Sequence, residues 1–86
     1  MEFEQYEQNL LNEWVVSQES TRLGVKTTVV CLQMDNGYEI LGSSSCVDPD
    51  DYDKEIGTFY ATKDALRNLK LIVGYVEQEE YNVSQQ

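Results

Sequence analysis

Apolar residues recur at three- and four-residue steps along the first part of the chain. The recurring positions are Phe3, Tyr6, Leu10, Leu11, Trp14 and Val15, with Glu, Gln and Asn residues between them. This spacing places the apolar side chains on one face of a helix. The pattern therefore predicts an amphipathic helix over residues 3 to 20, with Gly24 at its end or in the turn that follows.

The next segment has the composition of a β-hairpin. Residues 25 to 34 and residues 38 to 46 are rich in strand-forming residues, and Asn36-Gly37 lies between them. Asn and Gly both tolerate positive φ, so a two-residue type I′ turn is expected to join the strands. The sequence thus predicts an antiparallel hairpin over residues 25 to 46.

The expected turn determines which side chains share a face of the hairpin. It would place Gln33 opposite Ile40 and Cys31 opposite Gly42. Apolar side chains then occur on both faces, and a two-stranded hairpin alone is marginally stable in water. We therefore expect helices to cover one face and a second copy of the chain to cover or extend the sheet, which makes a homo-oligomer.

A second helix is predicted after the Asp-rich segment at residues 48 to 53. Pro and Asp are typical of a helix N-terminus, where Asp can cap free amides. The apolar and small residues that follow at helical spacing are Ile56, Phe59, Tyr60, Ala61, Ala65, Leu66 and Leu69. Since Gly74 interrupts the apolar run, the helix is expected over residues 50 to 69, and residues 77 to 86 are expected to form a frayed acidic tail.

These elements fit a single domain over residues 1 to 86, because a chain this short cannot build two cores. The predicted fold is α+β: an N-terminal helix, an antiparallel hairpin, a second helix and a short tail. No stretch approaches the roughly 20 apolar residues of a membrane span, and no signal peptide is recognisable. We therefore expect no membrane association and a reducing compartment, where Cys31 and Cys46 are free, buried thiols.

Charge narrows the expected ligands. Sixteen acidic against six basic residues give a formal net charge of -10, which disfavours general DNA or RNA binding. An acidic surface most often serves solubility, and mimicry of nucleic-acid charge is the sharper alternative. Outside the acidic helix start, the candidate phosphate contacts are Arg22, Lys26, Arg67 and Lys70.

The sequence offers no catalytic or metal-binding set. It contains no His, which removes the usual general base and the Ser-His and Cys-His pairs, so we do not expect an enzyme. A calcium loop starting at Asp48 would need Gly where Asp53 stands and Glu where Phe59 stands. Two Cys without His do not make a zinc site. Neither a metal nor a cofactor is predicted, and the Asp residues are expected to cap the helix.

Several short motifs occur in a distinctive order from Thr27 to Tyr75. They are Asn36-Gly37-Tyr38, Cys46-Val47-Asp48-Pro49, Asp53-Lys54-Glu55-Ile56-Gly57, Ala65-Leu66 and Gly74-Tyr75. In this order they resemble the family of small phage proteins named after gene forty-nine and gene sixty-six products. The resemblance implies a phage origin and a fold, and no particular activity. The chain departs from it at residues 70 to 73, where a Trp-Pro-like helix stop would be expected.

The chain is also similar to the Thoeris anti-defence protein of the first type, an oligomeric phage sponge for cyclic ADP-ribose-like immune signals. That resemblance implies a non-enzymatic protein that sequesters a small cyclic nucleotide in the host cytoplasm. The expected ligand-binding residues are Arg22, Lys26, Tyr38, Tyr52, Phe59 and Arg67. Their roles follow from side-chain chemistry: the cations would contact phosphates, and the rings would stack on a base or shape the pocket.

Two other functions remain open on the sequence. An acidic protein-interaction inhibitor or DNA mimic would block a host DNA-binding or defence protein and would carry carboxylates along one surface. A structural accessory protein of the virion or the replication machinery is the third alternative.

Overall fold

The structure is a computed structural model that describes the chain from residue 1 to residue 84, with side-chain surroundings for residues 1 to 74. Its elements in chain order are α1 (Gln5–Trp14), β1 (Val15–Leu23), β2 (Thr27–Met34), β3 (Glu39–Ser45), the 3-10 helix η1 (Pro49–Asp51) and α2 (Lys54–Ser84). The strands form one antiparallel sheet in the order β1-β2-β3. The α+β fold expected from the sequence is confirmed.

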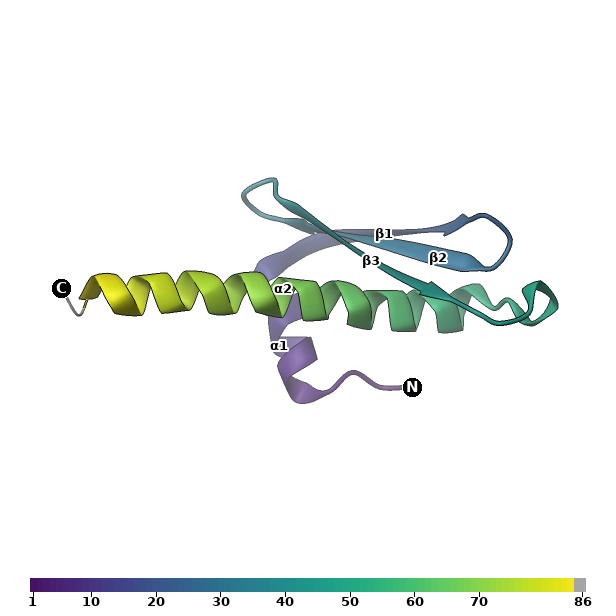
Figure 1. Ribbon diagram of the computed structural model, residues 1–86, viewed down its shortest axis with the longest axis horizontal. Coiled ribbons are helices and arrows are strands. Elements are labelled where there is room, and N and C mark those ends of the chain that lie inside the picture. Colours follow the sequence, from purple (N-terminus) through teal and green to yellow (C-terminus); the bar gives the residue numbers. More distant parts are fainter. Residues whose placement is uncertain (85–86) are drawn as a thin grey trace.

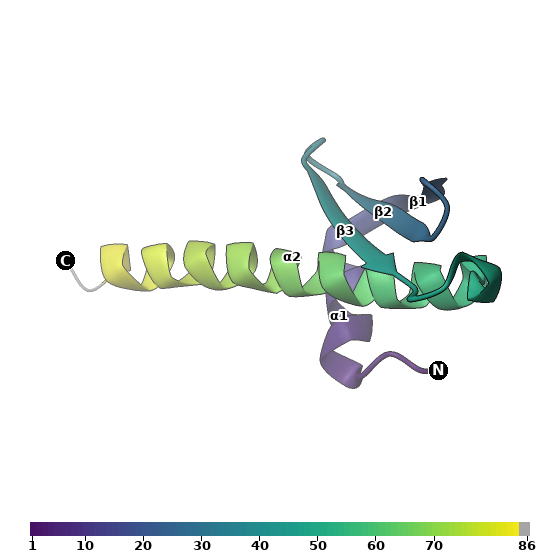
Figure 2. The same ribbon diagram turned by 45° about the vertical axis from the view of Figure 1, so that its right-hand side comes forward.

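The long helix α2 lies between the sheet and α1. It runs across one face of the sheet and continues beyond it, while α1 lies on the other side of α2 in both views (Figures 1 and 2). The buried core residues are Val30, Leu32, Met34, Ile40, Ala61, Ala65, Leu66 and Leu69. The core is therefore a single layer between α2 and the sheet, with β2 and β3 supplying the sheet side.

Burial along β2 alternates with every residue, as expected for a strand covered on one face only. Thr28, Val30 and Leu32 point toward α2 and are fully buried. On the opposite face, which we call the open face, Leu41 is 60% exposed. No described part of the chain covers the open face. Of the two apolar faces expected from the sequence, one therefore packs against α2 and the other has no covering element among the described residues.

Gly42 allows β3 to approach α2 closely. A Cβ atom at this position would collide with the backbone of Ala61 and Ala65. Both alanines are fully buried, so small residues on the helix meet a glycine on the strand. The short distance between the helix and the sheet is therefore possible because Gly42 has no side chain and Ala61 and Ala65 have only a methyl group.

The first helix is shorter than the sequence predicted. Helix α1 ends at Trp14, and the chain continues as β1, so a helix over residues 3 to 20 is wrong for its second part. The helical spacing of apolar residues stops at Val15. Beyond it the segment gains its backbone partners from β2, and this pairing outweighs local helix propensity. Gly24, with φ of 73°, turns the chain from β1 into β2.

The hairpin over residues 25 to 46 is confirmed, but its turn differs from the expected type. The Gly37 N–H donates to the Met34 carbonyl at 3.0 Å, and the Met34 N–H donates to the Tyr38 carbonyl at 2.8 Å. Only glycines have positive φ among the described residues, and Gly37 has φ of 88°. The connection is therefore a three-residue loop that ends in a left-handed glycine, not a type I′ turn.

The different turn shifts the register by one residue. Gln33 pairs with Glu39 instead of Ile40, and Cys31 pairs with Leu41 instead of Gly42. A shift of one residue moves a side chain to the other face of a sheet. Ile40 thereby joins the core, and Leu41 moves to the open face.

The start of the second helix follows the predicted capping. Asp48 accepts a hydrogen bond from the Asp50 N–H at 3.0 Å within η1. Asp53 then accepts from the Glu55 and Ile56 N–H groups at 2.9 and 3.2 Å, at the start of α2. These carboxylates satisfy amides that the helix itself leaves unpaired.

The predicted end of the second helix is wrong. Helix α2 passes through Gly74 and continues to Ser84, well beyond the end expected at residue 69. A single glycine inside a helix costs only about 1 kcal/mol relative to alanine, which a long helix tolerates. The tail expected over residues 77 to 86 is therefore helical to Ser84, and residues 85 and 86 lie outside the described residues.

Cys31 and Cys46 are free thiols, and each is half-buried instead of fully buried as expected. Burial, together with the hydrogen bond and charge of Glu39, raises the pKa of the Cys31 thiol, which keeps it protonated at neutral pH.

None of the described helices is both long and apolar enough to span a membrane.

Candidate functional site

The residues predicted to bind a ligand are not brought together. Lys26 and Tyr52 line a hollow beside η1. Arg22 does not line this hollow, but its guanidinium stacks 4.1 Å from the centre of the Tyr52 ring. Arg67 lies in a separate groove on α2. The cations expected to share one phosphate-binding site are thus divided between two sites.

The other two predicted residues lie elsewhere. Tyr38 lines an apolar hollow of about 200 Å³ with Trp14 and Ile72, close to the hairpin turn. Phe59 packs against Phe3, with ring centroids 4.8 Å apart, and helps to hold the N-terminal segment against α2. Phe59 therefore has a packing role in this structure.

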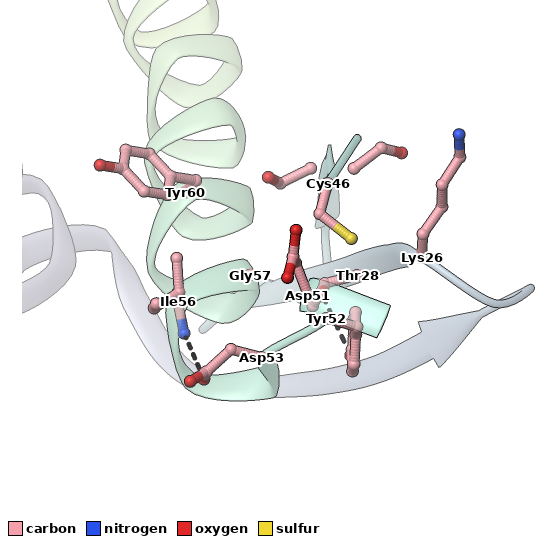
Figure 3. A pocket seen from close by; sticks show the side chains of 11 residues that line it. Lys26, Thr28, Cys46, Asp51, Tyr52, Asp53, Ile56, Gly57 and Tyr60 are labelled. Carbon is pink, nitrogen blue, oxygen red and sulfur yellow. Dashed lines mark hydrogen bonds between the residues drawn. The ribbon is translucent and has the colours of Figure 1, made fainter. Parts of the chain in front are cut away.

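The η1 hollow has a volume of about 240 Å³ and lies between η1, the start of α2 and the ends of β2 and β3 (Figure 3). Lys26 is the cation that lines it, whereas Asp51 and Asp53 line it as carboxylates. Tyr52 shares a hydrogen bond of 3.1 Å with the Thr28 hydroxyl. The charge balance of this hollow disfavours an anion.

A second site, the basic groove, lies between α1, β3 and the middle of α2 and has a volume of about 560 Å³. Its lining residues are Tyr6, Glu7, Ser43, Ser44, Tyr60, Lys63, Asp64, Arg67 and Lys70. Three of the six Lys and Arg residues of the chain are in this set. They are spaced four and three residues apart along α2, which places them on the same side of the helix.

Lys63 is engaged within the protein. Its ammonium group lies 2.7 Å from a carboxylate oxygen of Glu7, whose side chain is almost fully buried. Burial tends to raise the pKa of Glu7, but the Lys63 and Glu4 hydrogen bonds and the Lys63 charge outweigh burial and lower it. The same bond raises the pKa of Lys63. This ion pair joins α1 to α2 and forms one wall of the groove.

Asp64 holds two partners at the opposite wall. One carboxylate oxygen accepts the Ser43 N–H at 3.0 Å, and the other lies 2.5 Å from the Arg67 guanidinium. The Ser43 amide first, and then Arg67, lower the pKa of Asp64. Asp64 is therefore an ionised acceptor that orients Arg67, whose side chain is 72% exposed.

Lys70 and two aromatic rings complete the groove. The Lys70 ammonium lies 4.6 Å from the centre of the Tyr6 ring and forms no ion pair with any residue whose side chain is described. Tyr6 and Tyr60 are 45% and 52% exposed. The groove thus presents two accessible cations, Arg67 and Lys70, beside two exposed rings.

The sequence identified part of this site. Arg67 and Lys70 were both candidate phosphate contacts, but Tyr6 and Tyr60 were assigned to the apolar faces of their helices. The spacing of Lys63, Arg67 and Lys70 was the available signal for a cationic helix face. The position of α1 against that face was not predictable from the local pattern, because it depends on the Glu7–Lys63 contact.

The acidic segment carries no assembled cation site. In residues 1 to 74, no group of three or more His, Cys, Asp or Glu side chains is placed to hold a metal ion. Asp48 and Asp53 instead bind backbone amides.

Comparison with known proteins identifies a family. The family described as "Phage protein (N4 Gp49/phage Sf6 gene 66) family" matches residues 4–81 of the chain. No curated protein and no solved structure gave a match. The matched segment runs from the residue before α1 through most of α2. The resemblance inferred from the motifs is confirmed, and the chain belongs to the phage protein (N4 Gp49/phage Sf6 gene 66) family.

Proposed function

We propose that this phage protein binds a small cyclic nucleotide in the basic groove and sequesters it without cleaving it. Its role would be to remove an immune signal from the host cytoplasm. The observation that carries this proposal is the pairing of Arg67 and Lys70 with two exposed tyrosine rings in a groove of about 560 Å³. Phosphate and base are the two chemical parts of a nucleotide that such groups recognise.

Arg67 and Lys70 suit phosphate in complementary ways. A guanidinium offers a planar fork that donates two hydrogen bonds to phosphate, whereas an ammonium acts as a compact charge. Asp64 holds Arg67 at the groove wall, which restricts the freedom that Arg67 would otherwise lose on binding. Tyr6 or Tyr60 offers a surface for stacking, worth about 1–3 kcal/mol per base in other proteins.

Binding without cleavage is supported by the state of the nearby carboxylates. Asp64 and Glu7 both have lowered pKa values and hold cations or amides. An ionised, fully engaged carboxylate is a poor general acid, and the chain has no His to replace it. The groove therefore has groups for recognition and none suited to proton transfer near neutral pH.

Isothermal titration of the protein against a panel of cyclic mononucleotides, cyclic dinucleotides and cyclic ADP-ribose tests the proposal. We expect at least one ligand to bind and to be recovered intact after heating, as judged by mass spectrometry. The double variant Arg67→Ala/Lys70→Ala should weaken binding at least roughly 100-fold, since two charge-assisted contacts are lost. A folded protein that binds none of the panel would disprove the proposal.

The double variant Lys26→Ala/Lys54→Ala is the matched control, because it removes the same charge outside the basic groove. Binding should be kept in this variant. Loss of binding here, with retention in Arg67→Ala/Lys70→Ala, would place the ligand in the η1 hollow and contradict the assignment to the groove.

The formal net charge of -10 favours a second candidate function, an acidic inhibitor that occupies a host DNA-binding protein. Such a complex would weaken steeply with salt and would not depend on Arg67 or Lys70. This candidate would be supported if the wild type and Arg67→Ala/Lys70→Ala both captured a single DNA-binding enzyme and the wild type bound no nucleotide.

A further inference from the structure

The two edges of the sheet are treated differently. On β3, the Asp64 carboxylate accepts the Ser43 N–H at 3.0 Å, and the Asn68 side-chain amide donates to the Leu41 carbonyl at 3.0 Å. Side chains of α2 therefore occupy backbone groups that an added strand would need. The β3 edge is closed to further pairing.

The β1 edge has no such cover. Strand β1 pairs with β2 on one side only. Among the described residues, no hydrogen bond from outside the sheet reaches a backbone group of residues 17 to 23. Helix α2 packs over β3 and β2, and its polar link to β1 is the Ser20–Thr58 hydrogen bond of 2.7 Å. A long edge with unpaired N–H and C=O groups is a template for another strand.

We propose that β1 pairs antiparallel with β1 of a second copy, centred on Ser20, to form a continuous sheet with three strands from each copy. The register of β1 is irregular between Val15 and Ser17 and regular from there to Leu23. Ser20 is the midpoint of this regular stretch. Pairing about Ser20 therefore uses all of the regular edge and keeps α2 of both copies on the same face.

Charge favours this register over its neighbours. Centring on Ser20 places Glu19 opposite Thr21 of the second copy, and this contact occurs twice by symmetry. It also places Gln18 opposite Arg22. Centring on Glu19 would set two glutamates directly opposite each other, which is unfavourable. Centring on Thr21 would leave Ser17 and Gln18 unpaired within the regular stretch.

A charge change at one exposed position tests the pairing. In Thr21→Glu, a glutamate would face Glu19 at two places, so the dimer dissociation constant should rise roughly 3- to 30-fold. Thr21→Arg, the matched variant, would face Glu19 with the opposite charge and should dimerise at least as tightly as the wild type. Sedimentation and light scattering without nucleotide give the mass, and circular dichroism confirms that both variants fold.

Disulfide trapping tests the register itself. Both native cysteines are first replaced by Ser, because Cys31 is the partner of Glu19 within the chain. Glu19→Cys and Thr21→Cys are then made in separate chains of different length. Directly paired antiparallel residues have Cα atoms about 4.5–5.5 Å apart, within reach of a disulfide. Oxidation of the mixture should give mainly the mixed dimer, and each variant alone should give little.

Three results would overturn the proposal. The first is a monomeric wild type at micromolar concentration. The second is a dimer whose dissociation constant is the same in Thr21→Glu and Thr21→Arg. The third is a dimer that forms no mixed disulfide, which would place the interface on another surface.

Discussion

At the scale of single residues, packing around α2 depends on groups with little or no side chain. Gly42 faces Ala61 and Ala65 so closely that a methyl group would collide with helix backbone. Backbone cannot move aside as a flexible side chain can, so the strand and the helix would have to separate. The glycine therefore stabilises the fold through what it lacks.

Gly42→Ala should lower the free energy of unfolding by about 1–3 kcal/mol, because it overpacks the contact between β3 and α2. Gly74→Ala is the control within α2. No atom lies within 4 Å of a Cβ built there, so this change should raise the free energy by up to about 1 kcal/mol through helix propensity. Urea unfolding followed by circular dichroism measures both. Equal stability of Gly42→Ala and the wild type would contradict the close contact.

Glu7 should make stability depend on acid. Its pKa is lowered from 4.5 in the folded protein, so the stabilisation is complete above pH 4.5 and is lost as the pH falls through the lower folded value. Glu7→Gln should therefore reduce the midpoint of thermal unfolding at pH 7, and the difference from the wild type should shrink toward pH 3. A difference that stays constant across this range would mean that the charge of Glu7 does not hold α1 to α2.

At the scale of elements, the sequence pattern predicted correctly those features that depend on interactions between residues close together in the chain. The Asp caps and the hairpin were found, because capping and turn residues act over a few positions. Helix α2 begins at Lys54, after the separate helix η1, and not at residue 50 as expected. Strand β1 was missed, since its residues carry no apolar alternation and gain their partners from β2. Helix α2 was predicted too short, because one glycine is a weak stop inside an otherwise helical segment.

The residues of the candidate site were likewise predicted only in part. Arg67 was identified because its chemistry suits phosphate, but the sequence could not show that Lys26 lines the η1 hollow with Asp51 or that Arg22 stacks on Tyr52. These positions depend on the packing of η1 against the end of the sheet, which the local sequence pattern does not determine. The residue types therefore predicted candidate cations, but the three-dimensional structure was needed to show which of them lie in the same site.

Substitutions at Gly37 and Asn36 test the conformation of the hairpin turn. Its φ of 88° lies in the left-handed region, so Gly37→Ala should destabilise the protein by about 1–2 kcal/mol. Asn36→Gly should not repair this loss, although it would help a type I′ turn, because Asn36 does not have positive φ. Thermal unfolding of the single and double variants distinguishes the two turns. A neutral Gly37→Ala variant would contradict the three-residue loop.

At the scale of the whole molecule, the sheet separates two surfaces with different proposed roles. The basic groove includes Ser43 and Ser44 of β3, whereas the free edge belongs to β1, and β2 lies between them. Each surface draws on its own side chains of α2: Asp64 and Arg67 at the groove, and Thr58 at β1. The proposed ligand binding and the proposed self-association would therefore use the same fold but different residues.

This separation predicts that the two activities change independently. Arg67→Ala/Lys70→Ala should weaken nucleotide binding at least roughly 100-fold. It should leave the dimer dissociation constant unchanged within about twofold, since effects at distant sites without shared partners are additive. Thr21→Glu should weaken the dimer and leave the nucleotide affinity of each chain unchanged. Combining the three substitutions and measuring both constants completes the cycle. A change in nucleotide affinity that follows the fraction of dimer would show instead that the groove is completed by the second copy, and would shift the binding site toward the interface.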